Sequence, residues 1–166
     1  MRTIVAIDPG STQSAVVVMT TEYKILEHCK LINTNVLEML LYQYDPADTQ
    51  IVCEMIASYG MPVGAEVFET CVWIGRFLQA AEQAHIPFHR LYRQEEKLNL
   101  CHSTRARDSN IRQALIDRFA THDLKNGKGT KKNPDFFYGF RADEWAAAAV
   151  AVTFIDGHKE EISHDE

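Results

Sequence analysis

The sequence predicts one α/β domain whose five-stranded mixed sheet combines an antiparallel meander with parallel crossover strands and carries helices on both faces. Three observations lead to this fold class. Short β-branched runs open the chain, segments with helical spacing then alternate with further short runs, and 166 residues suit one domain with its own core. Because there is no internal repeat or linker, residues 1–156 are expected to form the domain and residues 157–166 a short acidic tail.

Three strands are expected at the start of the chain. Residues 3–7 are an apolar run that ends in the turn cluster Asp-Pro-Gly-Ser-Thr at 8–12, so this buried strand delivers a carboxylate to a turn. Residues 14–19 and 23–32 are two further strand-like runs, joined by the Thr-Thr-Glu turn at 20–22. The short connections predict an antiparallel meander.

Helices and strands alternate in the rest of the chain. The expected elements are a helix over 35–44, a strand over 50–54, a helix over 65–85, a strand over 87–92, and helices over 108–121 and 142–155. Thr34 or Asn35 is suited to cap the first helix, and Asp108 the third. The last helix has almost no polar residue after Glu144, so it must lie flat against the sheet.

The long helix over 65–85 has two apolar faces. Its expected core face carries Val67, Phe68, Cys71, Val72, Ile74, Gly75 and Leu78. A second stripe is formed by Trp73, Phe77 and Ala80, which follow one another at helical spacing. A helix with two apolar faces needs two partners, so the second stripe faces either another subunit or a further part of the same chain.

Composition is that of an intracellular globular protein. Hydrophobic residues make up 46% of the chain and charged residues 24%. The first residues form neither a signal peptide nor a membrane-spanning segment, so a cytoplasmic protein without a membrane partner is expected. The four cysteines, Cys29, Cys53, Cys71 and Cys101, show no metal-binding or redox spacing and are expected to be reduced and mostly buried.

Charge is distributed unevenly along the chain. The net charge of −6 argues at first against a nucleic-acid partner. Residues 90–141, however, hold twelve basic and six acidic residues, a net +6, and the remainder of the chain nets −12. This asymmetry fits either a basic face for a polyanion or a solvated surface with clustered charges. Within it, residues 125–134 (KNGKGTKKNP) predict a flexible basic loop able to follow a phosphate backbone.

Three carboxylates stand at positions where they can meet. Asp8 ends the first strand, Glu54 ends the fourth, and Asp143 opens the last helix, so all three are expected at the carboxyl edge of neighbouring strands. Each also has a structural explanation, in a turn, a buried ion pair or a helix dipole. Together they form the hard oxygen set that Mg²⁺ prefers, and without a metal they would raise one another's pKa. Two such ions about 4 Å apart activate water in phosphodiester hydrolysis.

Six segments in order carry a family resemblance. They are IVAIDPGST at 4–12, CE at 53–54, SYGMPVGAEVFETCVWIGRF at 58–77, RDSNIRQAL at 107–115, GKGTKKNP at 127–134 and FYGFRADEWAAAAVA at 137–151. With these segments the chain resembles the RuvC-like Holliday junction resolvases, which have the RNase H-like fold, and especially their phage-type members. The resemblance covers nearly the whole chain.

The resemblance implies that Asp8, Glu54 and Asp143 are catalytic acids that bind Mg²⁺, with Mn²⁺ as a substitute, and that a metal-activated water cuts DNA. Many members have a fourth ligand three positions before the last acid. Here that position is Phe140, which cannot bind a metal. Either Glu144 or another group therefore replaces it, or the site works with three acids.

The resemblance also implies contacts with a four-way DNA junction. Many relatives carry a lysine near the start of the penultimate helix, where this chain has Ser109, so Arg105 and Arg107 are candidates to supply the charge. The expected backbone contacts of the basic loop are Lys125, Lys128, Lys131 and Lys132. Tyr59 and Met61 either wedge into the opened centre of the junction or pack locally.

A homodimer through the long helix is implied as well, which gives the stripe of Trp73, Phe77 and Ala80 a role as the dimer interface. Two-fold symmetry would match two active sites to the symmetry of the junction. The expected function is therefore a structure-selective, metal-dependent endonuclease that resolves four-way junctions.

Two other functions remain open from the sequence. One is a nuclease of the same fold with broader branched-DNA or RNA-containing substrates. The other is a junction-binding protein with weak catalysis, which Phe140 at the ligand position favours. An ATP-binding domain of the actin, chaperone and sugar-kinase type shares the DPGST turn, but such folds need a second lobe for which 166 residues leave no room.

Overall fold

The computed structural model describes residues 2–159 and contains one five-stranded sheet. The strands are β1 (Thr3–Asp8), β2 (Gln13–Thr20), β3 (Ile25–Ile32), β4 (Thr49–Met55) and β5 (Phe88–Tyr92). The helices are α1 (Asn33–Tyr42), α2 (Ala65–Gln83), α3 (Arg93–Cys101), α4 (Asp108–Phe119) and α5 (Ala142–Gly157). The sheet order is β3-β2-β1-β4-β5. β1, β2 and β3 pair antiparallel, whereas β1, β4 and β5 run parallel, so the predicted fold class is confirmed.

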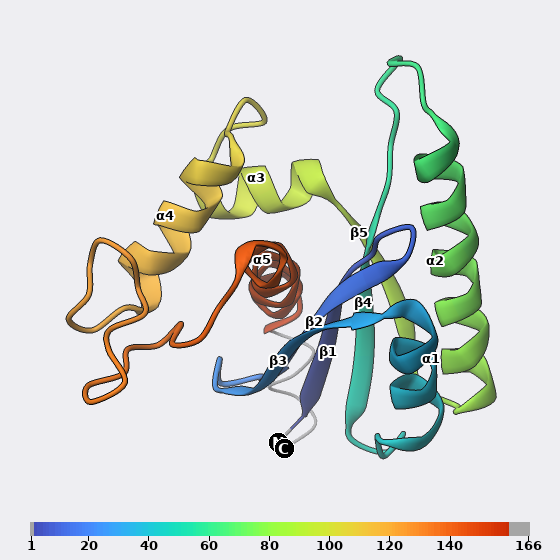
Figure 1. The fold of residues 1–166 in the computed structure, drawn as a ribbon, viewed down its shortest axis with the longest axis horizontal. Coiled ribbons are helices and arrows are strands. Elements are labelled where there is room, and N and C mark those ends of the chain that lie inside the picture. The colour runs from blue at the N-terminus through green and yellow to red at the C-terminus, as the bar shows by residue number, and fades with distance from the viewer. Residues whose placement is uncertain (1, 160–166) are drawn as a thin grey trace.

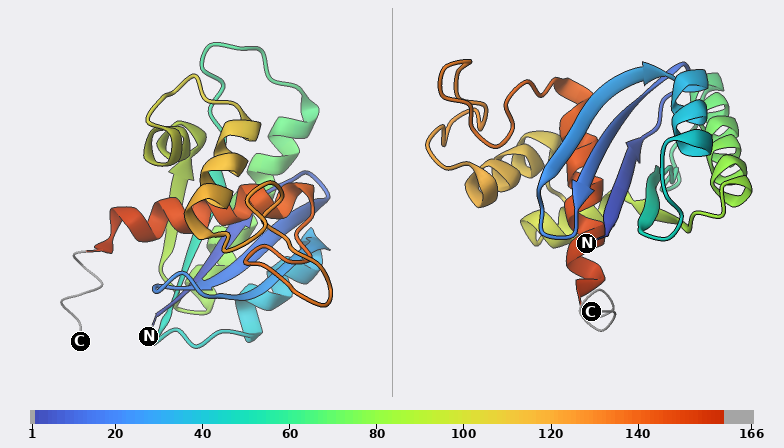
Figure 2. Two further views of the ribbon diagram at one scale, coloured as in Figure 1. Left: turned by 90° about the vertical axis from the view of Figure 1, so that its left-hand side faces the viewer. Right: turned by 90° about the horizontal axis from the view of Figure 1, so that it is seen from below.

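Helices cover both faces of the sheet (Figure 1). α1 and α2 lie side by side on one face, and α5 crosses the other face with α3 and α4 packed outside it (Figure 2). α5 is buried along nearly its whole length because the sheet and the two outer helices surround it, as its lack of polar residues predicts. No helix among residues 2–159 is both long and apolar enough to span a membrane. Most of the predicted acidic tail, from residue 160 on, lies outside the described residues.

The sequence does not reveal helix α3. This helix starts directly after β5, and its only buried residue is Glu96, so it lacks the apolar spacing that marks the other helices. The predicted caps also differ. Asn33 starts α1 and turns its side chain toward the β1–β2 turn, and Arg107 precedes α4, so Asp108 is already inside that helix. Asp108 is free to pair with another element as a result.

The core face of α2 differs in part from the sequence prediction, which is confirmed at Ile74 but wrong at Phe68, Val72, Phe77 and Ala80. Phe77 and Ala80, predicted for a dimer interface, are 0% and 2% exposed and pack with Ile74 into the core of this chain. Trp73 lies at the edge of that core, with the Arg76 guanidinium 3.9 Å from its ring. The large apolar residues exposed on or just before α2 are instead Met61, Val63, Phe68 and Val72. The stripe of Trp73, Phe77 and Ala80 therefore cannot form a dimer interface without unfolding the core.

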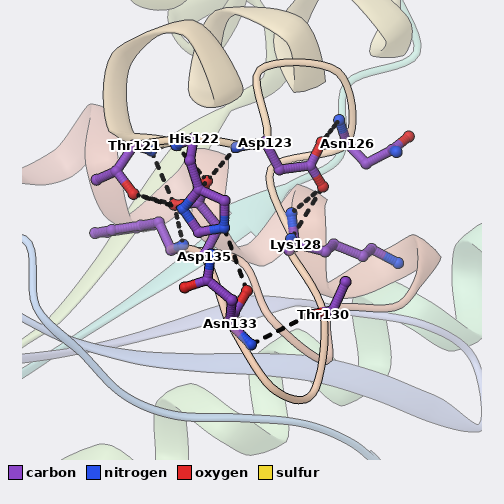
Figure 3. Close-up of polar contacts among 10 residues, drawn as sticks. Thr121, His122, Asp123, Asn126, Lys128, Thr130, Asn133 and Asp135 are labelled. Atoms are coloured by element: carbon purple, nitrogen blue, oxygen red, sulfur yellow. Dashed lines mark hydrogen bonds and ion pairs between the residues drawn. The ribbon is translucent and has the colours of Figure 1, made fainter.

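The basic segment before α5 is a pinned loop. The buried carboxylate of Asp135 accepts backbone N–H groups of Thr121, His122, Asp123 and Phe136 at 2.7–2.9 Å (Figure 3). Asp123 in turn accepts the N–H groups of Asn126, Lys128 and Gly129. The segment is not helical, as predicted. Its contacts do not indicate the expected flexibility, because two aspartates hold its backbone.

The observed core face of α2 leads to a stability prediction. Phe77→Ala empties a fully buried position and should lower the free energy of unfolding by about 3–5 kcal/mol. Phe68→Ala, at a side chain that is 61% exposed on the same helix, should change it by less than about 1 kcal/mol. Urea unfolding at a concentration where the chain is monomeric measures both. Equal losses in the two variants would contradict this assignment of the core.

Candidate active site

Strand alternation brings Asp8 and Glu54 together. On β1, Ala6 packs toward α5 and Ile7 toward α1 and α2, so Asp8, the next residue, lies on the α5 side. On β4, Cys53 packs with Ile7, its partner in the parallel register. Glu54 therefore follows on the same side as Asp8, at the carboxyl end of the neighbouring strand.

The third acid comes from the start of α5. Asp143 lies in the first turn of this helix, which begins above the same sheet edge, and it lines one cavity with Asp8 and Glu54. The cavity has a volume of about 510 Å³. The other lining residues are Arg93, Asp108, Ser109, Ile111, Arg112, Ala142, Trp145 and Ala146. The structure thus confirms that the three acids converge.

A closed set of hydrogen bonds fixes the turn after Asp8. The Gly10 N–H donates to Ser14 Oγ at 3.1 Å, the Ser14 hydroxyl donates to Asn33 Oδ1 at 2.6 Å, and the Asn33 amide donates back to the Gly10 carbonyl at 2.8 Å. A Cβ on Gly10 would lie 2.2 Å from the Gln13 carbonyl oxygen, so only glycine fits. Because β1 and this turn are rigid, Asp8 has a fixed place in the cavity wall.

The cavity carries an excess of negative charge. Burial, reinforced by the nearby Glu54 and Asp143 carboxylates, raises the pKa of Asp8 to about 8. Burial also raises the pKa of Glu54, although Arg93 opposes this effect. With a pKa of about 8, Asp8 retains its proton at neutral pH, while the Glu54 and Asp143 carboxylates lie close by. A bound cation would replace that proton and relieve the repulsion.

Two cations flank the acids. Lys30 on β3 lies in the same row across the sheet as Asp8, with the small Ala15 between them, and its ammonium pairs with Asp143. On the other side, Arg93 Nη1 lies 3.9 Å from Glu54 Oε2. Asp143 and Glu54 therefore each have a cation close by, and Asp8 lies between these two acids.

Sequence reasoning missed several charged residues in the wall of this cavity or just behind it. Arg93 follows β5 directly, the same strand-end position that singled out Asp8 and Glu54, so its place in the sequence was a usable signal. Glu96 and Lys30 gave no signal, because a charged residue in a polar stretch is usually solvated. Burial and the nearby Glu54 carboxylate raise the pKa of Glu96 to about 9.

Glu144 does not join the three acids, although it was a candidate metal ligand. Its Oε2 accepts the Arg141 N–H at 2.7 Å and lies 3.1 Å from His28 Nδ1, so it closes the start of α5. It does not line the cavity of Asp8. Phe140, at the position of the expected fourth ligand, is 1% exposed and packs against the His28 ring at 4.5 Å between centroids. The structure offers no replacement ligand at either residue.

The predicted DNA-contacting residues lie on three loops. Arg105 and Arg107 are exposed between α3 and α4. Tyr59 and Met61 are 57% and 70% exposed between β4 and α2, on a loop that rises beyond the carboxyl edge of the sheet (Figure 1). In the loop between α4 and α5, Lys125, Lys131 and Lys132 are exposed and Lys128 is half-buried. None of them lines the cavity itself.

The donor set of the cavity fits a hard divalent cation. Within residues 2–159, no three His, Cys, Asp or Glu side chains are arranged to hold a metal ion in their observed conformations. Asp143 is turned to Lys30 instead. The fit lies in the chemistry of the donors, because three carboxylates converge on a cavity in which burial and negative neighbours raise the pKa of Asp8. A cation would need Asp143 to exchange Lys30 for the metal.

Comparisons with known proteins identify the fold. No protein-family model matches the chain, and no curated protein matches it by sequence. The structure matches the RuvC structure of Thermus thermophilus with a TM-score of 0.67 and 18% sequence identity, over 95% of this chain and 96% of that one. The chain has the RuvC fold. It also matches T. thermophilus RuvC in complex with a Holliday junction substrate, with a TM-score of 0.66, 16% identity and 92% coverage of both chains.

The RuvC fold of this chain should lose stability as the pH rises in the absence of metal. Between the ordinary pKa of 3.8 and about 8, the folded chain holds a proton at Asp8 that the unfolded chain has released. Deprotonation in this window therefore destabilises the folded state. In EDTA, the Tm should fall by at least about 4 °C between pH 5.5 and 8.5, and millimolar Mg²⁺ should reverse part of the fall.

Asp8→Asn is the matched variant. It should show a smaller fall, since the Asp8 contribution is gone and the raised pKa values of Glu54 and Glu96 remain, and Mg²⁺ should have less effect. Scanning calorimetry at several pH values measures both. The interaction between the acids would be contradicted if the Tm of Asp8→Asn had the same pH dependence as that of the wild type and Mg²⁺ changed the Tm of neither protein.

Proposed function

We propose that this chain is a metal-dependent endodeoxyribonuclease that cleaves four-way DNA junctions. The observation that carries the proposal is the convergence of Asp8, Glu54 and Asp143 in one cavity at the carboxyl edge of a RuvC-fold sheet. The nearby cations do not balance the negative charge of this cavity. Three carboxylates at such an edge suit metal-assisted phosphodiester hydrolysis. The junction-bound T. thermophilus RuvC structure supports the choice of substrate for the proposal.

The three acids would hold Mg²⁺ or Mn²⁺. The metal supplies an activated water and stabilises the charge that develops on the leaving oxygen. Asp8 is the central acid, because it lies on a rigid strand end between Glu54 and Asp143 and has the raised pKa. Lys30 would have to leave Asp143 for this acid to hold a metal, and its ammonium would then be free to contact a phosphate.

Basic loops beside the cavity provide the sequence-independent part of DNA binding. Arg105 and Arg107 follow α3, and the lysines 125, 128, 131 and 132 lie on the loop pinned by Asp123 and Asp135. A fixed backbone presents these charges with little loss of conformational entropy on binding. Tyr59 and Met61 extend from the β4–α2 loop as apolar contacts for unstacked bases.

The nuclease activity can be tested with synthetic DNA. In Mg²⁺ or Mn²⁺ the protein should cut a four-way junction at least about 10-fold faster than a linear duplex, and Asp8→Asn should abolish cutting, since catalytic acids contribute orders of magnitude to rate. Junction binding by Asp8→Asn should persist. Gel assays at matched salt measure both, because backbone binding depends strongly on salt.

Other outcomes of the same assay point to other functions. Equal or faster cutting of a linear RNA–DNA hybrid would assign an RNase H-like nuclease. Tight junction binding without cleavage in any divalent metal would assign a junction-binding protein.

We propose in addition that the active form is a homodimer. The apolar residues Met61, Val63, Phe68 and Val72 are 70%, 37%, 61% and 56% exposed, and they extend from the β4–α2 loop along the outer face of α2. Exposed apolar side chains along one helix face favour association. An isologous dimer on this face would place two cavities in a two-fold arrangement that suits a four-way junction.

Charges on this face should disrupt the dimer. Phe68→Asp combined with Val72→Asp should convert a dimer into a monomer in sedimentation velocity at micromolar concentration, because burying the new carboxylates is unfavourable. Tyr42→Asp on α1, where the tyrosine is 81% exposed, is the matched control and should leave the dimer intact. A wild-type monomer at all concentrations would refute the dimer but not the nuclease.

A further inference from the structure

Arg93 is the one guanidinium in the described chain that bridges carboxylates from three elements of the active-site wall. Its Nη1 lies 2.9 Å from Oε2 of Glu96 on α3 and 3.9 Å from Oε2 of Glu54 on β4. Its Nη2 pairs with Asp108 at the start of α4. The side chain is only 22% exposed. Arg93 therefore links Glu54, a proposed metal ligand, to two helices outside the sheet.

Glu96 is an unusual residue for its position. It is 0% exposed and is the only buried residue of α3. Its Oε2 contacts Arg93, but within the described structure its Oε1 has no hydrogen-bond partner. An apolar residue of similar size at such a position is usually neutral or stabilising, because burying a carboxyl group has a large desolvation cost whether the group is charged or neutral. The buried carboxylate thus weakens the fold unless the position of Arg93 matters.

The contacts form a rigid path from the helix layer to Glu54. β5 pairs with β4 in register, with Leu91 opposite Glu54 and Tyr92 opposite Met55, and Arg93 is the next residue after this pairing ends. The Tyr92 N–H also donates to the Glu95 carboxylate, which fixes the first turn of α3. The backbone of Arg93 is thereby held beside the end of β4, and Glu96, one turn later, fixes the guanidinium.

We propose that Arg93 is a positioning residue that orients the Glu54 carboxylate in the metal site, and that Glu96 is the buried anchor of Arg93. The inference deepens the proposed function and rests on it for the role of Glu54. Arg93 acts through Glu54, and Glu96 acts through Arg93. Neither touches the DNA. Metal binding should therefore depend on the contact between Glu96 and Arg93, although neither residue is a ligand.

The direction in which Arg93→Met changes the Mn²⁺ affinity distinguishes a positioning role of Arg93 from a purely electrostatic effect of its charge. Removing the positive charge of Arg93 from beside the acids should by Coulomb's law strengthen the binding of a divalent cation. Loss of orientation should weaken it. We expect Arg93→Met to raise the Kd for Mn²⁺ by about 10-fold or more, in the range seen when residues that orient metal ligands are removed. Electron paramagnetic resonance titration of the protein alone with Mn²⁺ measures this without DNA or cleavage.

Conservative variants test the anchor. Glu96→Gln keeps an acceptor for Arg93 and should remain within about 3-fold of the wild type, whereas Glu96→Leu removes it and should behave like Arg93→Met. Arg93→Lys keeps the charge but cannot bridge three carboxylates with a planar fork, so it should restore only part of the Mn²⁺ affinity. Tighter or unchanged Mn²⁺ binding in Arg93→Met would overturn the proposal.

Arg118→Met is the matched control. Arg118 makes a bidentate pair with Asp156, at 2.6 and 2.8 Å, away from the cavity. Its loss should lower the Tm without changing the Kd for Mn²⁺. If Arg93→Met lowers the Tm as Arg118→Met does and leaves the Kd for Mn²⁺ unchanged, the ion pair is structural and the proposal fails. Circular dichroism confirms that each variant is folded. If Arg93→Met does not fold, the Mn²⁺ affinities of Glu96→Gln and Arg93→Lys decide whether Arg93 has a positioning role.

Cleavage then separates failure of this inference from failure of the proposed function. In junction cleavage, Arg93→Met should lower kcat by about 10-fold or more with KM within about 3-fold, since it affects the metal site and not DNA binding. A rise in KM with unchanged kcat would instead mean that Arg93 contacts DNA, which overturns the positioning role. A wild-type protein that binds Mn²⁺ but cuts no junction would refute the proposed function, while the Mn²⁺ titration would still decide the role of Arg93.

Discussion

Repulsion between Asp8 and Glu54 is the constraint on which the rest of the site depends. The parallel register of β1 and β4 places both carboxylates at the same edge and on the same face of the sheet. Burial prevents water from screening their charges, so the pKa of Asp8 is raised and Asp8 retains its proton at neutral pH. The surrounding cations balance this charge only in part. Arg93 approaches Glu54, and Lys30 pairs with Asp143.

Helices α5 and α3 bring charged groups to this site in different ways. α5 brings the N-terminal end of its dipole and Asp143 to the cavity, and its small side chains let it pack closely on the sheet. α3 contributes a buried Glu96 in place of an apolar side chain and so holds Arg93 beside Glu54. The cavity in which the mutually repelling acids converge thus has a cation fixed beside Glu54 from a separate element. The buried groups that lower the stability of the fold are concentrated near the site.

Basic residues of the 90–141 segment lie both in the cavity wall, at Arg93 and Arg112, and on loops that do not line the cavity. The acids that converge on the cavity account for part of the negative balance outside residues 90–141, while the lysines of the α4–α5 loop lie on a backbone pinned by Asp123 and Asp135. Backbone N–H donors from Asp123, Thr121 and His122, although opposed by desolvation, hold the pKa of Asp135 well below its usual range. The pinning therefore persists across the physiological pH range. An acidic protein can in this way present basic loops outside an acidic cavity.

The sequence by itself determined the fold class, the five strands and the convergence of Asp8, Glu54 and Asp143. Each of these rests on local pattern, since alternation and strand-end position are properties of short segments. Only the tertiary structure decided which face of α2 is core, because two apolar stripes on one helix have the same local spacing. Only it revealed α3 and the burial of Glu96, since a charged residue carries no local sign of being buried. Burial and ion pairing depend on which elements meet, and residues far apart in the chain decide that.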